Sequence, residues 1–218
     1  MKIGVCLAGC GVMDGSEIHE SVITILALDR LGVEIIFMAP DVNQLKVVNH
    51  LDASNLNENR NVRVESGRIA RGSVMDIAEV SSNNIDALIF PGGFGAALNL
   101  CDFGISGPNC NIHSEVKRIV QEMIQSKKPI GAICIAPAML AKAIEDLNLN
   151  AKLTIGTDSG TASAIESMGS KHINCSVTDC VVDETNKIVT TPAYMLSENI
   201  SEVATGIEKL VTKIIQFV

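Results

Sequence analysis

Short apolar runs alternate with longer amphipathic segments along this chain, and that alternation limits the fold more than any other feature. The apolar runs are too hydrophobic to leave one face in water, which is typical of parallel strands buried on both faces. Amphipathic helices between them would cover both faces of the sheet. We expect an α/β fold with a mostly parallel central sheet and strands over residues 3–8, 33–38, 87–90 and 130–134.

Four helices fit the spacing of the apolar residues. The first lies between the first two strands, with Ser16 as its N-cap and Gly32 as its stop. The second covers residues 114–126, the third begins just after Cys134, and the fourth is a long C-terminal helix within 197–218. Before the last helix, "CVVDETNKIVTTPAY" predicts a hairpin with a four-residue turn at "ETNK". Residues 41–85 are rich in Asn and Arg and predict an irregular or hairpin insertion.

Composition limits the partners that the chain can have. The 218 residues carry a formal net charge of −8, so they lack the basic surface that nucleic acid or an anionic membrane needs. No segment approaches the roughly 20 apolar residues that span a bilayer. The seven cysteines show neither a paired framework nor zinc-finger spacing. We therefore expect a single domain with reduced thiols, no metal and a cytoplasmic location.

Two glycine-rich stretches follow predicted strands. In "LAGCGVMDGSE" the third glycine, Gly15, comes one place too late for a dinucleotide-binding fingerprint, so a tight strand-to-helix turn is the better interpretation. In "PGGFGA", Gly92 and Gly93 directly follow a buried strand, where the backbone can approach a ligand closely and donate N–H groups to it. No cofactor is expected from either stretch.

The stretch "AICIAP" has the residue plan of a nucleophile elbow. Small residues lie two places before and two places after Cys134, and Pro137 suits the first turn of the following helix. A lone Cys in an apolar run is more often a core residue. Here the strand-end position favours a reactive thiol whose pKa is lowered by the helix N-terminus. The N–H groups of Gly93 and Ile135 could stabilise an oxyanion beside it.

The motifs "PGGFGA", "AICIA" and "SEIHE" together resemble the ThiJ/PfpI superfamily of class I glutamine amidotransferase-like proteins. The stretches "GCGVMDGSEIHE", "PGGFGAALNL", "LTIGTD" and "IVTTPAYML" resemble its ElbB-type glyoxalase subfamily, and they spread over nearly the whole chain. This resemblance implies one flavodoxin-like three-layer sandwich over residues 1–218 and a homodimer. It also implies cofactor-free conversion of glyoxal and similar small dicarbonyls to the hydroxy acid.

The resemblance further implies that a Glu from the first helix is paired with Cys134. Glu17 and Glu20 compete for this role, and both lie on one face of that helix at i, i+3 spacing. In relatives the key Glu lies twelve residues before the Gly that closes the helix. Counting back from Gly32 gives Glu20, with Glu17 as the second choice.

The chain departs from the superfamily pattern at the usual catalytic histidine. Many members have His directly after the elbow Cys, where this chain has Ile135, and no His follows Cys134 before His172. Amide hydrolysis is therefore disfavoured, because no evident group would protonate a leaving amine. His19, His113 and Cys10 could stand in, although exposure or packing explains each of them more simply.

The expected reaction begins when Cys134 adds to one aldehyde of glyoxal to form a hemithioacetal. Glu20 then moves a proton through an enediol, and water releases glycolate from a thioester. Two alternatives stay open. One is a regulatory or redox-sensing dimer in which Cys134 is reversibly oxidised. The other is a deglycase acting on glycated amines with the same residues.

Overall fold

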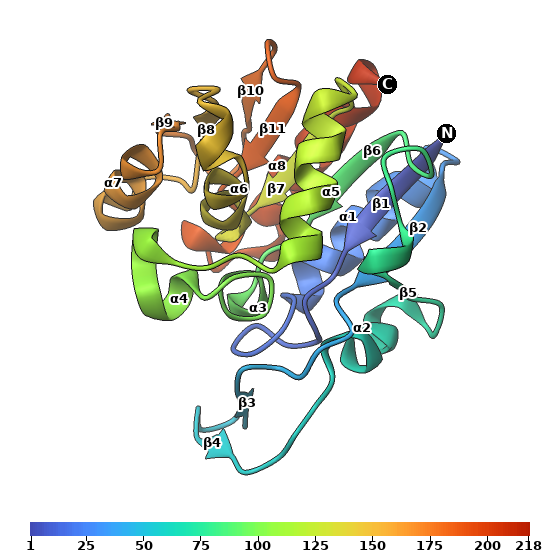
Figure 1. Ribbon diagram of the computed structural model, residues 1–218, viewed down its shortest axis with the longest axis vertical. Coiled ribbons are helices and arrows are strands. Elements are labelled where there is room, and N and C mark those ends of the chain that lie inside the picture. Colours follow the sequence, from blue (N-terminus) through green and yellow to red (C-terminus); the bar gives the residue numbers. More distant parts are fainter.

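A computed structural model describes residues 1–218 and contains a seven-stranded sheet in the order β10-β11-β7-β6-β1-β2-β5 (Figure 1). All neighbouring strands are parallel except β10, which is antiparallel to β11. The strands are β1 (Lys2–Cys6), β2 (Glu34–Ala39), β5 (Met75–Asp76), β6 (Ala87–Phe90), β7 (Ile130–Ile133), β10 (Val181–Asp183) and β11 (Ile188–Thr191). The mostly parallel sheet expected from the apolar runs is confirmed.

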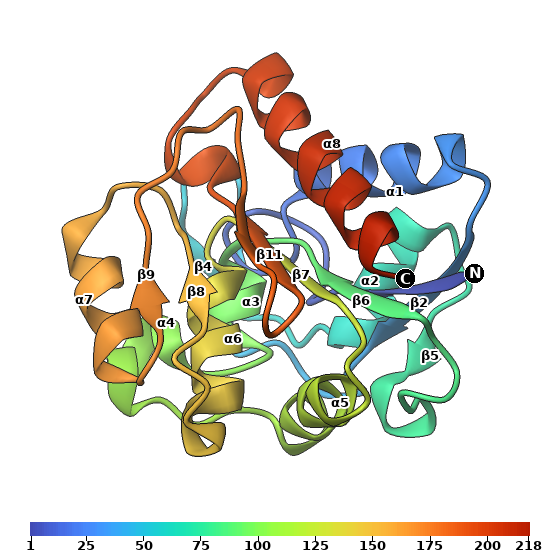
Figure 2. The ribbon, with the colours of Figure 1, turned by 90° about the horizontal axis from the view of Figure 1, so that it is seen from above.

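Helices cover both faces of the sheet and make three layers, which Figure 2 shows from above. One face carries α1 (Ile18–Arg30) packed against α8 (Ile200–Phe217), and the other carries α5 (Ser114–Gln125) packed against α6 (Ala136–Ile144). The remaining helices are α2 (Val62–Ala70), α3 (Phe94–Leu98), α4 (Phe103–Ser106) and α7 (Ser159–Ser167). Short 3-10 turns are η1 (Ile77–Glu79), η2 (Gly107–Asn109), η3 (Glu145–Leu147) and η4 (Ala193–Met195).

Strand β6 shows how the sequence builds a core on each side of the sheet. Its residues are all fully buried, and successive side chains of a strand point to opposite faces. Ala87 and Ile89 belong to the core beneath α1 and α8, whereas Leu88 and Phe90 belong to the core beneath α5 and α6. An uninterrupted apolar run is therefore what a strand in the middle of this sheet requires.

The predicted elements agree with the structure to within a few residues at their ends, except in two places. Ser16 does not cap α1: its hydroxyl accepts a hydrogen bond from Ala8 N at 2.8 Å, and Glu17 is the N-cap. In the segment 41–85 the expected hairpin is present, but a helix and a further strand of the main sheet were not expected. It contains a small hairpin of β3 (Val47–Val48) and β4 (Asn55–Leu56), then α2, and then β5, which extends the main sheet beyond β2.

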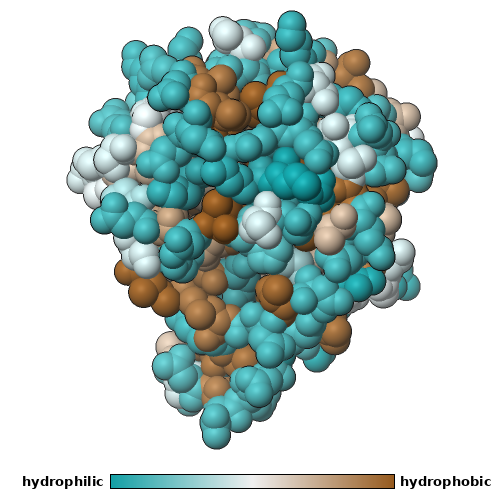
Figure 3. All heavy atoms as spheres, in the orientation of Figure 1, coloured by the Kyte–Doolittle hydropathy of each residue, from teal (hydrophilic) through white to brown (hydrophobic).

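The surface is mixed in polarity. In Figure 3 the hydrophobic residues on the face shown form separate groups among hydrophilic ones, as is usual for a folded chain. Beside β10 and β11, at one edge of the sheet, the short strands β8 (Lys152–Leu153) and β9 (Lys171–His172) form a two-stranded pair. This pair also lies next to α7. None of the helices combines the length and the apolar character that crossing a membrane requires.

Candidate active site

The candidate site lies at the carboxyl ends of β1, β6 and β7. The chain passes from β1 to β2 on one side and returns to β6 on the other side of β1. In open α/β sheets, ligands bind at such a switch point, outside the carboxyl ends of the strands. Glu17 and Glu20 follow β1, Gly92 and Gly93 follow β6, and Cys134 follows β7, so the topology brings these residues together.

Cys134 lies on a strained turn between β7 and α6. Its φ of 61° is left-handed, a conformation that costs a non-glycine residue of order 1–3 kcal/mol and persists only where surrounding contacts impose it. Its N–H donates to Thr191 O of the neighbouring strand at 2.9 Å. Ala132 and Ala136 are fully buried on either side, and Pro137 lies in the first turn of α6. These contacts are the elbow geometry that the small residues predict.

Two backbone N–H groups, from Gly93 and Ile135, lie close enough to the Cys134 sulfur to favour negative charge on it and so oppose the rise of its pKa. Gly93 has a φ of 90°, and a Cβ atom there would lie 2.5 Å from Gly15 O. Only glycine can therefore turn its N–H toward the sulfur at this position. The pair of donors forms a cradle for negative charge beside the sulfur.

Glu20, not Glu17, contacts the sulfur. The Glu20 side chain is fully buried, and it lies beside Cys134: a Cβ atom placed on Gly92 would come within 2.6 Å of both Cys134 Cβ and Glu20 Oε2. Its carboxyl oxygens also accept hydrogen bonds from Gly92 N at 2.9 Å and from Tyr194 N at 3.3 Å. Burial, assisted by the nearby charge of Glu17, raises the pKa of Glu20 to about 8. The carboxyl is therefore mostly protonated at neutral pH.

The pKa of Cys134 is raised well above its ordinary value, so the expectation of a lowered pKa was wrong. Burial and the Glu20 carboxylate disfavour the thiolate, and together they outweigh the hydrogen bonds from Gly93 and Ile135. The sulfur is a thiol at rest. A thiolate can form only when a neighbouring group takes its proton, and Glu20 is the ionisable side chain in contact with it.

A cavity of about 530 Å³ opens in front of the elbow. The residues that line it include Cys134, Ile135 and Gly93 of the elbow region, and also Glu17 and Tyr194. The other lining side chains are mostly hydrophobic, which suits a small ligand held by a few polar groups. Glu17 has a second task as the N-cap of α1, where its carboxylate accepts a hydrogen bond from Glu20 N at 2.6 Å.

The three possible substitutes for the missing His lie in different places. His113 is the N-cap of α5 and accepts from Glu115 N at 3.2 Å, so its ring is engaged outside the cavity. Cys10 is half-buried, and the charged groups nearest it include Glu65 and Arg68 of α2. Only His19 lies at the cavity, where it is hydrogen-bonded to a lining residue. No group of three or more His, Cys, Asp or Glu side chains is arranged to hold a metal.

Sequence reasoning missed Tyr194 as a site residue. It is the single tyrosine of the chain and lies in η4, directly after Ala193, whose φ is 45°. The Tyr194 N–H bonds to Glu20, and its side chain lines the cavity. The motif "TTPAY" was visible in the sequence, but the pairing of β11 with β7, which brings it beside Cys134, was not.

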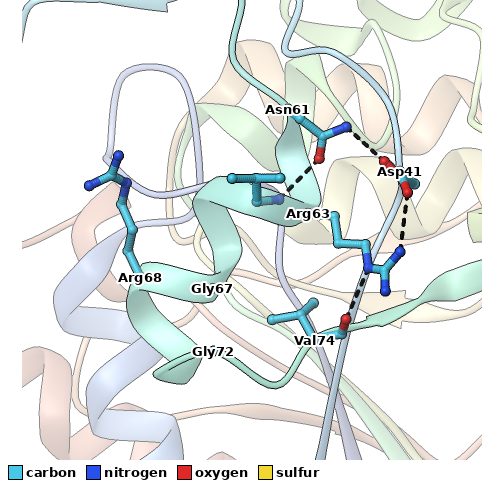
Figure 4. A pocket seen from close by; sticks show the side chains of 8 residues that line it. Asp41, Asn61, Arg63, Gly67, Arg68, Gly72 and Val74 are labelled. Atoms are coloured by element: carbon cyan, nitrogen blue, oxygen red, sulfur yellow. Dashed lines mark hydrogen bonds and ion pairs between the residues drawn. The ribbon is translucent and has the colours of Figure 1, made fainter.

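A second hollow, of about 570 Å³, lies beside α2 and is drawn in Figure 4. There the Arg63 guanidinium pairs with Asp41 at 3.1 Å and donates to Val74 O at 2.9 Å. Asn61 caps α2 and also bonds to Asp41. These polar groups satisfy one another, and they join α2 to the chain segments before and after it.

A flavodoxin-like sheet with a cysteine elbow at its strand ends is the architecture of the class I glutamine amidotransferase-like proteins. Residues 10–195 match the model of the DJ-1/PfpI family, and the chain belongs to that family. The chain is 41% identical over 225 residues to the ES1 protein homolog, mitochondrial, of Rattus norvegicus, covering 99% of this chain and 83% of the rat protein.

Two further comparisons agree with this assignment. The human glutamine amidotransferase-like class 1 domain-containing protein 3, mitochondrial, is 41% identical over 99% of this chain and 82% of its own length. A crystal structure described as an isoprenoid biosynthesis protein with amidotransferase-like domain, from Ehrlichia chaffeensis, superimposes with a TM-score of 0.93 at 39% identity over 100% of both chains. The rat and human names contradict the cytoplasmic location expected from the cysteines and point to a mitochondrial one.

Proposed function

We propose that this protein is a cofactor-independent glyoxalase of the ElbB type, which converts glyoxal and similar small dicarbonyls to the hydroxy acid. The observation that carries the proposal is the placement of the buried Glu20 carboxyl beside Cys134 on its strained turn, next to a cavity of small-molecule size. Membership of the DJ-1/PfpI family supports a glyoxalase or deglycase type of role.

The first step needs a thiolate, and Glu20 is placed to generate it. In the form of the site that carries a Glu20 carboxylate, the thiol proton passes to Glu20 as the sulfur bonds to one aldehyde carbon. The electron pair of the carbonyl moves onto its oxygen, and the N–H groups of Gly93 and Ile135 stabilise the negative charge. Glu20 then returns the proton to that oxygen, which leaves a neutral hemithioacetal.

The second stage moves a hydrogen between the two carbons. Glu20 takes the proton from the carbon bonded to sulfur, a carbon–carbon double bond forms, and the second carbonyl oxygen takes up a proton. When the Glu20 proton returns to the second carbon, the hydroxyl on the sulfur-bearing carbon loses its proton, which balances the one gained by the second oxygen, and a thioester of glycolic acid results. Water then adds to the thioester, the Cys134 thiol leaves, and glycolate is released. One carbon is oxidised and the other is reduced, so no external electron carrier is needed.

The test is turnover of glyoxal and methylglyoxal in an amine-free buffer, with the hydroxy acid measured by proton NMR. We expect Cys134→Ala and Glu20→Gln to lower kcat/KM by at least about 100-fold. Cys180→Ala, which removes a half-buried thiol outside the cavity, should leave it unchanged. Full activity in Cys134→Ala would overturn the proposal.

The pH dependence gives an independent check. Because a Glu20 carboxylate starts the reaction and its pKa is about 8, kcat/KM should rise as the pH increases from 6 toward about 8. The raised pKa of Cys134 disfavours the redox-sensor alternative, since peroxide oxidises the thiolate. Deglycase activity would use the same residues, so it is tested with a glycated amine in buffers scavenged of free dicarbonyl.

A further inference from the structure

Tyr194 connects the buried site to solvent through a hydrogen bond to His19. The distance between the Tyr194 hydroxyl and His19 Nδ1 is 2.7 Å, and the two rings pack at a centroid distance of 5.8 Å. Tyr194 is partly buried in the cavity wall, and His19 is exposed on the first turn of α1. The pair joins a residue that lines the cavity to an exposed histidine.

The other three histidines are engaged with the backbone. His50 Nε2 accepts from Met13 N at 3.1 Å, and His172 Nε2 accepts from Ile155 N at 3.2 Å. His113 does the same as the N-cap of α5. His19 alone has a ring nitrogen hydrogen-bonded to the side chain of a residue that lines the cavity.

The backbone fixes Tyr194 close to the reacting sulfur. Its N–H bonds to the Glu20 carboxyl, and that carboxyl lies beside the Cys134 side chain. Ala193 holds the turn with a φ of 45°, a strained value that a buried alanine keeps only when its surroundings impose it. The backbone of Tyr194 is therefore held beside the Glu20 carboxyl, and Tyr194 is one of the residues that line the cavity in front of the thiol.

We propose that Tyr194 is a further catalytic acid–base residue of this site, and that His19 positions its hydroxyl and links it to solvent. The inference rests on the proposed glyoxalase function. It fills a gap in the reaction, because Glu20 moves a proton between the two carbons and a second group must move one between the two oxygens.

While Glu20 removes the proton from the sulfur-bearing carbon, the Tyr194 hydroxyl gives its proton to the second carbonyl oxygen, and the enediol forms. When Glu20 returns its proton to the second carbon, the hydroxyl on the sulfur-bearing carbon gives its proton to the Tyr194 phenolate. Burial and the charges of Glu17 and Glu20 raise the pKa of Tyr194, so the phenol carries its proton at neutral pH.

The first experiment compares Tyr194→Phe, His19→Gln and the control His113→Gln with the wild type. We expect Tyr194→Phe to lower kcat by about 100-fold, His19→Gln to lower it by a smaller factor, and His113→Gln to leave it unchanged. Alkylation of Cys134 by iodoacetamide, followed by mass spectrometry, should stay within twofold in all of them. A purely structural role of Tyr194 would disturb the thiol and change that alkylation rate.

The second experiment uses the fact that the chain has one tyrosine and no tryptophan. Biosynthetic fluorotyrosine labels Tyr194 alone, and it is a stronger acid than tyrosine. The high-pH limb of kcat should move to lower pH by the same amount as the absorbance titration of the fluorophenol. The same labelling of Tyr194→Phe is the control, since it has no tyrosine to label.

The outcomes separate the two proposals. If the wild type is active and Tyr194→Phe keeps the full kcat, the role of Tyr194 is overturned and the glyoxalase function stands. The same conclusion follows if the high-pH limb of kcat does not move in the fluorotyrosine protein. A wild type no more active than Cys134→Ala overturns the glyoxalase function, and the role of Tyr194 fails with it. A 100-fold loss in Tyr194→Phe together with a moved limb supports both.

Discussion

Glu20→Gln should change how the stability of the protein depends on pH. The pKa of Glu20 rises from 4.5 to about 8 on folding, so between these values the folded state holds one more proton than the unfolded state. Between these two pKa values, the Glu20 carboxyl therefore lowers the free energy of unfolding of the wild type by about 1.4 kcal/mol for each unit that the pH rises. From pH 5 to pH 8 the contribution is about 4 kcal/mol, lost as the buried carboxyl is forced to ionise.

The assay is urea unfolding followed by circular dichroism in reducing buffer, at half-unit steps from pH 5 to 8. Glu20→Gln binds no proton, so its free energy of unfolding should fall less steeply than that of the wild type. Only the difference in slope matters, because the amide alters local hydrogen bonds by a pH-independent amount. Glu79→Gln, on the exposed surface, controls for loss of one carboxylate. Parallel curves for the wild type and Glu20→Gln would refute the reasoning.

Three further substitutions test the packing around the site. Gly92→Ala should destabilise the fold by about 1–3 kcal/mol and abolish turnover, because its Cβ would lie 2.6 Å from Glu20 Oε2. The control is Gly160→Ala, whose Cβ would meet no atom closer than 3.6 Å, and it should leave the thermal melt unchanged. Asn99→Ala should cost about 3 kcal/mol in urea unfolding, since its buried amide makes three hydrogen bonds between loops. Arg63→Ala should change stability by less than about 1 kcal/mol and leave kcat/KM unaltered; reduced turnover would show that the hollow beside α2 belongs to the site.

The sheet could be predicted because a strand that is buried on both faces is an uninterrupted run of apolar residues in the sequence. The run at 87–90 matches β6 residue for residue, and the runs for β1, β2 and β7 differ only at their ends. The insertion was less visible for the opposite reason. Strand β5 is two residues long and lies at the sheet edge, and α2 is short and polar on most of its surface, so neither carries a strong periodic signal.

The site could be predicted as far as local sequence controls it. The elbow around Cys134 follows from flanking alanines and a proline, which local sterics require. The choice between Glu17 and Glu20 could not be made from i, i+3 spacing alone, because both face the sheet end. It depends on which carboxyl the N-cap of α1 uses, and Glu17 is that residue. Tyr194 reaches the site only through the pairing of distant strands.

The charge state of the elbow shows why these residues must act together. The N-terminus of α6 and the N–H groups of Gly93 and Ile135 favour a thiolate at Cys134. Burial and the Glu20 carboxylate oppose it more strongly, so the thiol stays protonated. Glu20 is held protonated by the same burial. A thiolate therefore forms by proton transfer within the pair, and neither group has a pKa that belongs to it alone. Loss of either Cys134 or Glu20 should consequently cost nearly as much activity as loss of both, which a double-mutant cycle on turnover would measure.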